Sequence, residues 1–291
     1  MELLVPSPTV KALVLGAGGQ LGSELTRLLP GAVGLSHLEL SVSDRPAVLE
    51  ACLLHQPDVV FNCAAYNAVD RAEAEPAVAR EVNAAGPENV ALACRRQGAR
   101  LVHFSTNFVF DGLSDRPYIE KDEARPLGVY GRSKLDGELA VLAAMPEALV
   151  VRTAAVFGDR GSVIKGGSFP ERIVERARRG ERLRVVSDQR VNPTYARDLA
   201  RASVALAAGE LKGVVHVVAD GCCAWDEFAR AALAACGVEA EVGAVTSAEL
   251  AAAAPRPSNG CLGSVRTSPL RPWREGVAEW AAGWAGNTKR P

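Results

Sequence analysis

Tyr130 and Lys134 form a YxxxK pair whose chemistry would be proton transfer. Residues four apart lie on the same face of a helix, so the phenol and the ammonium would be neighbours. A free tyrosine has a pKa of about 10 and exchanges protons poorly near neutral pH. A nearby ammonium favours the phenolate and lowers that pKa. The pair is a candidate acid–base site, although composition alone also allows such a pair on a surface.

A glycine-rich turn follows the apolar run 10–15. Glycines at 16, 19 and 22 give the spacing GxxGxxG. Glycine allows a tight turn, close approach of the backbone to a pyrophosphate, and close contact between helix and strand. A helix that begins there offers free N–H groups and the positive end of its dipole to phosphate. The pattern favours dinucleotide binding over a plain tight turn. The expected contacts are Gly16, Gly18, Gly19, Gln20, Leu21 and Gly22.

Two later loops carry polar or small residues directly after strand-like runs. Residues 105–107, Ser-Thr-Asn, follow the run 100–104, and alanines at 64–65 follow the run 58–61. Ligands of open α/β sheets bind at the carboxyl ends of strands, so the Thr106 hydroxyl is a candidate partner for a substrate carbonyl. Alanines let the backbone pass close to a cofactor. Each loop alone also fits a simple turn or tight packing.

Apolar runs alternate with helical segments, which predicts a parallel sheet covered on both faces. The expected fold class is α/β, a Rossmann-type doubly wound parallel sheet with a small C-terminal substrate-binding lobe. Expected strands are 10–15, 32–35, 58–61, 100–104, 149–152, 183–186 and 214–218, with helices at 19–29 and 75–97. Lobe elements are expected at 225–236, 242–245 and 275–284. Residues 10–152 and about 170–219 are assigned to the Rossmann domain, about 153–169 and 220–285 to the lobe, and 1–9 and 286–291 to tails.

Charge and cysteine usage exclude several classes of protein. The chain has 33 basic and 34 acidic residues, a balance that predicts neither a nucleic-acid nor a membrane-surface partner. No apolar run reaches the ~18–20 residues of a bilayer span, and the start does not read as a secretory signal. Seven scattered cysteines include the adjacent pair Cys222 and Cys223 but no CxxC, so we expect reduced thiols in a cytoplasmic protein. The four histidines form no metal-ligand pattern, and no metal site is expected.

Several segments resemble one family of short-chain dehydrogenases/reductases. Residues 64–73 (AAYNAVDRAE) are similar to AAxTAVDxAE, residues 105–112 (STNFVFDG) to STDYVFDG, and residues 129–138 (VYGRSKLDGE) to VYGxTKLxGE. Shorter matches are 151–153 to an RTSW stretch, 188–194 to DQxGxPT and 256–262 to RPxNSxL. With the glycine turn, they make about residues 11–280 resemble the dTDP-4-dehydrorhamnose reductase family of extended short-chain dehydrogenases/reductases.

The resemblance implies NAD(P)H-dependent reduction of the 4-keto group of a dTDP-4-keto-6-deoxy sugar, dTDP-4-dehydrorhamnose to dTDP-L-rhamnose. Tyr130 would protonate the developing alkoxide, Lys134 would lower the pKa of Tyr130 and bind the nicotinamide ribose, and Thr106 would hydrogen-bond the same oxygen. Expected cofactor contacts also include Ser36, Cys63, Ala64, Ala65 and Tyr66. Implied substrate contacts are Val69, Asn107, Phe108, Ala155 and Arg256.

Five positions depart from the family pattern and leave the exact sugar open. Asn107 and Phe108 replace Asp and Tyr, Ala155 replaces Trp, and Gly260 replaces Ser. Arg197 falls about where some members have a Glu linked to a magnesium-bridged dimer; the resemblance allows a homodimer. Two alternatives stay open. One is a reductase or epimerase for another nucleotide sugar, and the other a non-catalytic regulatory subunit resembling that of methionine adenosyltransferase.

The residues after the second strand bear on the choice of cofactor. NAD-specific Rossmann proteins place an acid there, ~20 residues after the glycine turn, on the ribose hydroxyls. Here Ser36 and His37 follow the run 32–35, with neither a carboxylate to repel a 2′-phosphate nor an arginine to clamp it. We expect a modest preference for NADPH with NADH also used. Glu39 is the nearest acid, and it would reach the ribose if the strand ended later.

Overall fold

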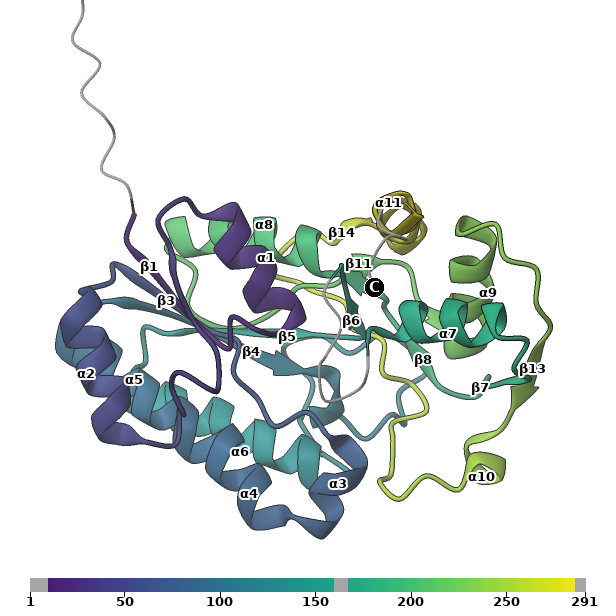
Figure 1. Cartoon of the computed structure of the whole chain (residues 1–291). Helices are drawn as coiled ribbons and strands as arrows, with labels where there is room; N and C mark the ends of the chain where they lie inside the picture. Colours follow the sequence, from purple (N-terminus) through teal and green to yellow (C-terminus); the bar gives the residue numbers. More distant parts are fainter. Residues whose placement is uncertain (1–9, 160–166, 286–291) are drawn as a thin grey trace, which may run out of the picture.

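The computed structural model describes residues 10–159 and 167–285, and its largest element is a six-stranded parallel sheet (Figure 1). The expected tails lie outside the described residues. The strand order β10-β5-β4-β3-β1-β2 is that of a doubly wound sheet, which confirms the predicted fold class. The strands are β1 (Ala12–Leu15), β2 (Val33–Leu35), β3 (Val59–Asn62), β4 (Arg100–Thr106), β5 (Leu149–Thr153) and β10 (Gly213–His216).

Helices cover both faces of this sheet (Figure 1). Leu13 and Leu15 of β1 pack on the face covered by α2, α5 and α6, whereas Ala12 and Val14 pack on the face covered by α1 and α8. Burial on both sides explains why the strands are apolar throughout rather than alternating. The helices are α1 (Gln20–Leu28), α2 (Arg45–His55), α5 (Gly86–Gln97), α6 (Val129–Ala144) and α8 (Ala196–Ala208).

The expected helix 75–97 is interrupted. α3 (Val69–Ala74) and α4 (Pro76–Arg80) precede a π-helical turn, Glu81–Ala85, and α5 continues from there. Pro87 has no N–H with which to continue the regular hydrogen-bond ladder, so the helix changes its winding just before it. The Asn83 side chain in this turn donates to the Tyr66 carbonyl and to the Ser133 hydroxyl, which links the turn to α6.

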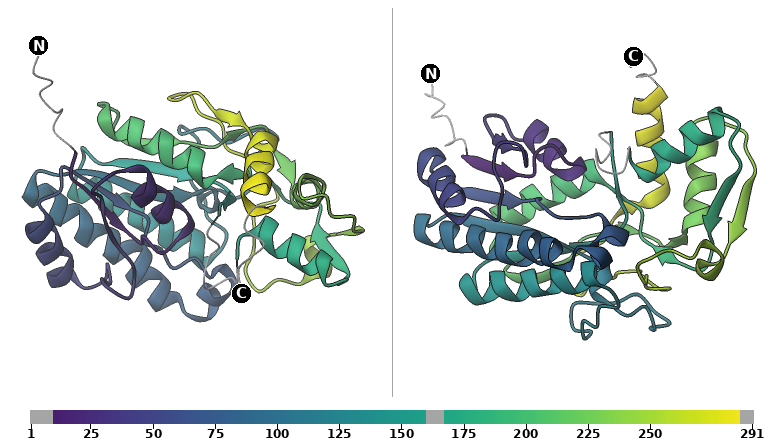
Figure 2. Two further views of the ribbon diagram at one scale, coloured as in Figure 1. Left: turned by 45° about the horizontal axis from the view of Figure 1, so that its top comes forward. Right: turned by 60° about the horizontal axis from the view of Figure 1, so that its bottom comes forward.

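A smaller lobe stands to one side of the sheet in both views of Figure 2. Its core gathers Phe157, Tyr195, Phe228 and Trp280. α7 (Phe169–Arg178) lies against α9 (Trp225–Ala235), and β7 (Leu183–Val186) pairs in parallel with β13 (Val242–Val245). The remaining elements are α10 (Ser247–Leu250), α11 (Trp273–Ala285), β6 (Val156–Phe157), β8 (Arg190–Val191), β9 (Thr194–Tyr195), β11 (Ala219–Asp220), β12 (Cys223–Ala224) and β14 (Leu270–Pro272).

Residues 170–219 do not stay together as expected. α7 and β7 pack with the lobe, while α8 and β10 complete the main sheet. The run 183–186 was expected to continue the main sheet, and that expectation is wrong. An apolar run of this length identifies a strand but not its partner, because pairing depends on contacts distant in sequence.

The cysteines differ from expectation in one pair. Cys222 and Cys261 form a disulfide with a Cα–Cα distance of 6.1 Å, so the expectation of reduced thiols throughout is wrong. The partners are 39 residues apart in sequence and meet only after folding. The free cysteines in the described residues are Cys52, Cys63, Cys94, Cys223 and Cys236. Among the helices of the described chain, none has the length and apolar character needed to cross a membrane.

Candidate active site

The glycine turn brings three distant segments together at the carboxyl edge of the sheet. Gly16 has φ +77°, and a Cβ there would lie 2.7 Å from the Ala64 nitrogen. Its own N–H donates to the Leu35 carbonyl at 2.8 Å. A Cβ on Gly18 would lie 3.6 Å from the Ser36 Cβ. The cofactor residues expected from the sequence therefore lie close together, although they come from the glycine turn, from the loop after β3 and from the end of β2.

The residues present fit a dinucleotide. No side chain caps the N-terminus of α1 at Gly19, so its first N–H groups remain available to a phosphate. The Gln20 Oε1 atom is buried without a hydrogen-bond partner, which is costly unless a ligand supplies a donor. Gly16 to Gly22 would hold the pyrophosphate, and Ser36 the adenosine ribose.

Glu39, the nearest acid after the second strand, brings its carboxylate to Ser36 although the strand ends before it. β2 ends at Leu35, which confirms the expected strand end before Ser36. The loop then turns back, and the Ser36 N–H donates to Glu39 Oε2 at 2.7 Å. This hydrogen bond lowers the pKa of Glu39. An ionised carboxylate thus lies beside Ser36, where a ribose 2′-substituent is expected.

Tyr130 and Lys134 both lie on α6, as the YxxxK spacing predicted. Lys134 is 2% exposed, and its ammonium donates to the Phe104 carbonyl at 2.7 Å. Burial lowers the pKa of Lys134 to about 8, and the Glu138 carboxylate opposes that change. The lysine is held against the end of β4, beside the candidate proton donor.

Burial raises the pKa of Tyr130 to about 12, and a hydrogen bond with Thr106 acts in the opposite direction. The expected lowering of this pKa by Lys134 is wrong for this structure, because loss of water around the phenolate outweighs the favourable contacts. A raised pKa keeps the phenol protonated at neutral pH. That is the form needed to give a proton to an alkoxide.

A buried ion pair fixes α6 against the sheet. Arg152 at the end of β5 donates to the Glu138 carboxylate of α6 at 2.6 Å, and both side chains are almost fully buried. Ser105 at the end of β4 donates to the same carboxylate. A charge pair in this setting contributes position more surely than stability. The Arg152–Glu138 pair thereby fixes the position of Tyr130 and Lys134 along α6 relative to Thr106.

The start of α6 is fitted to its surroundings at two glycines. A Cβ on Gly131 would overlap the Phe108 carbonyl, and a Cβ on Gly128 would lie 2.6 Å from Glu73 Oε1. The same Glu73 oxygen accepts from the Val129 N–H at 2.8 Å, which caps the helix. These close contacts place Tyr130 in the first turn of α6 next to the segment after β4.

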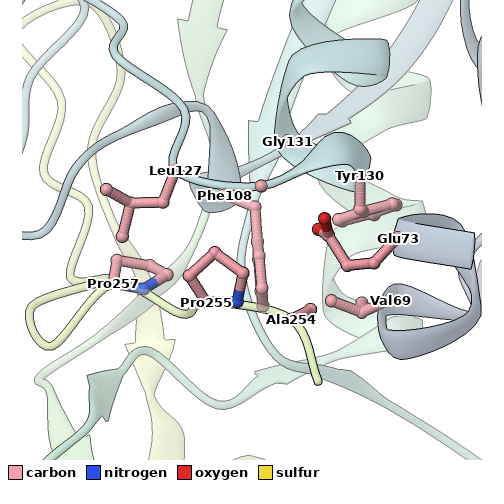
Figure 3. Close-up of a pocket in the computed structure, with 10 residues that line it drawn as sticks. Val69, Glu73, Phe108, Leu127, Tyr130, Gly131, Ala254, Pro255 and Pro257 are labelled. Atoms are coloured by element: carbon pink, nitrogen blue, oxygen red, sulfur yellow. The ribbon is translucent and has the colours of Figure 1, made fainter. Parts of the chain in front are cut away.

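A shallow hollow opens at Tyr130 (Figure 3). The Phe108 ring lies edge-on to the Tyr130 ring with 5.4 Å between centroids. Phe108 and Val69 were expected at a substrate site, and the hollow brings both to Tyr130. Sequence reasoning missed the rest, although Glu73 belongs to the segment 64–73 and Pro257 to the segment 256–262. The lining is Val69, Glu73, Phe108, Leu127, Gly128, Tyr130, Gly131, Ala254, Pro255 and Pro257.

Three other expected contacts lie outside that lining. Asn107 is buried and donates to the Gly260 carbonyl. Ala155 has φ +41°, an unusual conformation for a residue with a side chain. Arg256 pairs with Asp70 at 2.8 Å. Among the cofactor residues, the Tyr66 hydroxyl donates to Glu75 at 2.5 Å, and burial raises the pKa of Cys63 above its ordinary range.

Arg197 lies within an ion-pair network. It contacts Asp159 at 2.5 Å and Glu279 of α11 at 2.9 Å. The same Glu279 also pairs with Arg271. This cation joins α8 to α11 within the chain and is unsuited to bind a metal cation. Across residues 10–159 and 167–285, no group of three His, Cys, Asp or Glu side chains is arranged to hold a metal ion.

Comparisons with known proteins agree with this geometry. The family described as RmlD substrate binding domain matches residues 10–284. A dTDP-4-dehydrorhamnose reductase of Mycobacterium tuberculosis is 43% identical, over 96% of this chain and 94% of the relative. A dTDP-4-keto-6-deoxy-D-glucose reductase of Streptomyces niveus is 35% identical, over 93% of this chain and 96% of the relative.

The crystal structure of dTDP-4-dehydrorhamnose reductase from Bacillus anthracis in complex with NADP has a TM-score of 0.89 to this chain, at 30% identity. The match covers 94% of this chain and 99% of that chain. Sequence family, near full-length relatives and solved structure all point the same way. The chain belongs to the dTDP-4-dehydrorhamnose reductase family and is an NAD(P)H-dependent oxidoreductase of the kind that reduces dTDP-4-keto sugars.

Proposed function

We propose that this enzyme reduces the 4-keto group of dTDP-4-dehydrorhamnose to give dTDP-L-rhamnose and uses both NADPH and NADH, because the Glu39 carboxylate beside Ser36 opposes the 2′-phosphate of NADPH. The observation that carries the proposal is the position of Tyr130 at a hollow bounded by Phe108 and Val69. When bound, the nicotinamide dinucleotide would supply the hydride for the sugar C4. Tyr130 gives its proton to the oxygen that becomes an alkoxide at that carbon.

Thr106 and Lys134 assist the same proton transfer. Thr106, hydrogen-bonded to Tyr130, would turn its single hydroxyl hydrogen from Asn107 Oδ1 to the reacting oxygen and stabilise the charge that develops there. Lys134 keeps a positive charge one helical turn from the phenol. That charge favours the phenolate left after proton donation and is available to the hydroxyls of the nicotinamide ribose. Arg152 and Glu138 hold α6 in place while this occurs.

A panel of dTDP-4-keto-6-deoxy sugars with NADPH tests the proposal. Oxidation of NADPH with dTDP-4-dehydrorhamnose, and a product with the C4 configuration of L-rhamnose, is the expected result. A second candidate is reduction of another dTDP-4-keto-6-deoxy sugar. It is favoured by the apolar Phe108 at the hollow and by a relative that carries the name of a 6-deoxy-D-glucose reductase. Faster turnover of such a sugar would select this second candidate.

Glu39→Ala is expected to raise the ratio of kcat/KM with NADPH to kcat/KM with NADH by about fivefold. The carboxylate beside Ser36 repels a 2′-phosphate at short range, and its removal relieves that repulsion. Steady-state kinetics with both dinucleotides measure it. Glu210→Ala, an exposed acid before β10 at the opposite edge of the sheet, is the matched control. An unchanged ratio in Glu39→Ala would place the ribose away from this carboxylate.

Phe108→Tyr is expected to change the choice between sugars more than the rate with the best one. The ring already borders the hollow. Its new hydroxyl would form a hydrogen bond with one sugar or be left unpaired against another, a difference of ~1–3 kcal/mol when the group is buried. The ratio of kcat/KM for two keto sugars, compared with the wild type, gives the answer. Identical ratios in the two proteins would show that position 108 does not meet the sugar.

Full activity is expected to survive dialysis against EDTA. Proton donation from Tyr130 and charge stabilisation by Thr106 require no metal. Initial rates before and after chelation, with magnesium added back to half of the sample, provide the measurement. Loss of activity on chelation that magnesium restores would contradict this prediction.

A further inference from the structure

We propose that Asn107 is a positioning residue that joins Thr106 to the pocket loop, residues 254–262, and that glycine at position 260 makes this link possible. The kinetic part of the proposal rests on the proposed function. The family resemblance placed Asn107 at the substrate, whereas the structure turns its amide away from the hollow and toward the loop.

Both ends of the Asn107 amide have partners. The side chain is 2% exposed. Its Nδ2 donates to the Gly260 carbonyl at 2.9 Å, and its Oδ1 accepts from the Thr106 hydroxyl at 3.3 Å. The Thr106 hydroxyl in turn accepts from the Phe108 N–H at 3.2 Å. One amide therefore orients the Thr106 hydroxyl and holds the backbone of the pocket loop.

The pocket loop forms one wall of the hollow. Pro255 and Pro257 line it opposite α6, and the wall beside them is Phe108, the residue that follows Asn107 (Figure 3). The loop is also paired with β8, since Arg190 N–H donates to the Ser258 carbonyl and Gly260 N–H to the Arg190 carbonyl, each at 2.8 Å. Asn107 connects this loop to Thr106, the residue whose hydroxyl meets Tyr130.

A side chain at position 260 would require the Asn107 amide to move. A Cβ there would overlap the Asn107 Nδ2 atom and would lie 3.1 Å from the Arg190 carbonyl. Aspartate at position 107 would instead set a buried carboxylate against the Gly260 carbonyl, with no donor between the two oxygens. The two departures from the family pattern thus compensate each other. Serine at 260 could donate its hydroxyl to an aspartate at 107.

A double-mutant cycle with Asn107→Asp, Gly260→Ser and the double variant tests this compensation. Each single change is expected to raise the sugar KM at least tenfold and to leave the NADPH Kd within twofold. The sugar KM of the double variant is expected to be at least tenfold lower than the value obtained by multiplying the two single effects. Additive effects would overturn the proposal. Matched controls are Asn89→Asp, which also loses amide bonds to backbone carbonyls, and Gly283→Ser, which has open space.

The effect on Thr106 has a separate readout. An aspartate at 107 retains the Thr106 hydroxyl hydrogen more strongly, so Asn107→Asp is expected to lower kcat as well. In a Thr106→Val background the same change should leave kcat unaltered; a further fall in kcat there would contradict the role through Thr106.

The unfolding midpoints of the same variants in urea give the coupling without any sugar. If no keto sugar is turned over, the proposed function fails, while coupled midpoints would still support the Asn107–Gly260 link and additive midpoints would overturn it.

Discussion

Tyr130→Phe is expected to lower kcat by about 10²–10⁴-fold, the range for loss of a positioned general acid. The ring would still pack edge-on against Phe108, so the hollow keeps its shape. Only the hydroxyl that meets Thr106 is lost. The Kd for NADPH should stay within a few-fold of the wild type, because the phenol contributes little to holding the dinucleotide.

Stopped-flow absorbance of NADPH and fluorescence titration of the cofactor separate these two quantities. Tyr118→Phe is the control, because it also loses a tyrosine hydroxyl, one that donates to Asp111 and does not line the hollow. The control should lose stability, on the order of 1 kcal/mol, and keep its kcat. Wild-type turnover by Tyr130→Phe with a verified substrate would remove Tyr130 from the mechanism.

Lys134→Met should lose both turnover and affinity for the cofactor, because one side chain serves two purposes. We expect kcat to fall at least ~100-fold, within the range for acid–base groups, and the Kd for NADPH to rise about tenfold, the equivalent of one charge-assisted hydrogen bond. Methionine has similar length and is apolar, so the site keeps its packing. A variant with normal NADPH affinity would show that Lys134 does not touch the ribose.

The pKa of Lys134 gives this prediction a pH dependence. Burial lowers that pKa from 10.5 to about 8, so the ammonium is present below about pH 8 and is lost as the pH rises through it. We expect kcat/KM to decline above about pH 8, and this limb to be absent from the residual rate of Lys134→Met. Because the folded-state pKa is depressed, the lysine's contribution to stability is present above the unfolded pKa. That contribution is lost as the pH falls through about 8. The free energy of unfolding, measured in urea, should therefore rise between pH 7 and pH 10.

Local patterns were sufficient to place the catalytic face of the molecule. The YxxxK spacing put Tyr130 and Lys134 one turn apart on α6, and helical geometry requires nothing else to make them neighbours. The glycine turn after β1 gave the cofactor edge for a similar reason, since only glycine tolerates the conformation of Gly16 against Ala64. The end of β2 before Ser36 followed from the apolar run that precedes it.

Properties that depend on distant contacts were not available in this way. The pairing of β7 with β13, the Cys222–Cys261 disulfide and the Asn107–Gly260 hydrogen bond each join segments separated by at least 39 residues. None of these pairs has a spacing signature in the chain.

The ionisation of Tyr130 shows the same division within one motif. The sequence determined that a phenol and an ammonium would be neighbours, and from that alone a lowered phenol pKa was expected. The tertiary structure decided the outcome by burying Lys134 fully and Tyr130 in part and by directing the ammonium to the Phe104 carbonyl, so the pKa of Tyr130 rises and that of Lys134 falls. Spacing along a helix is a local property, whereas the loss of water around a charge depends on every segment packed over it.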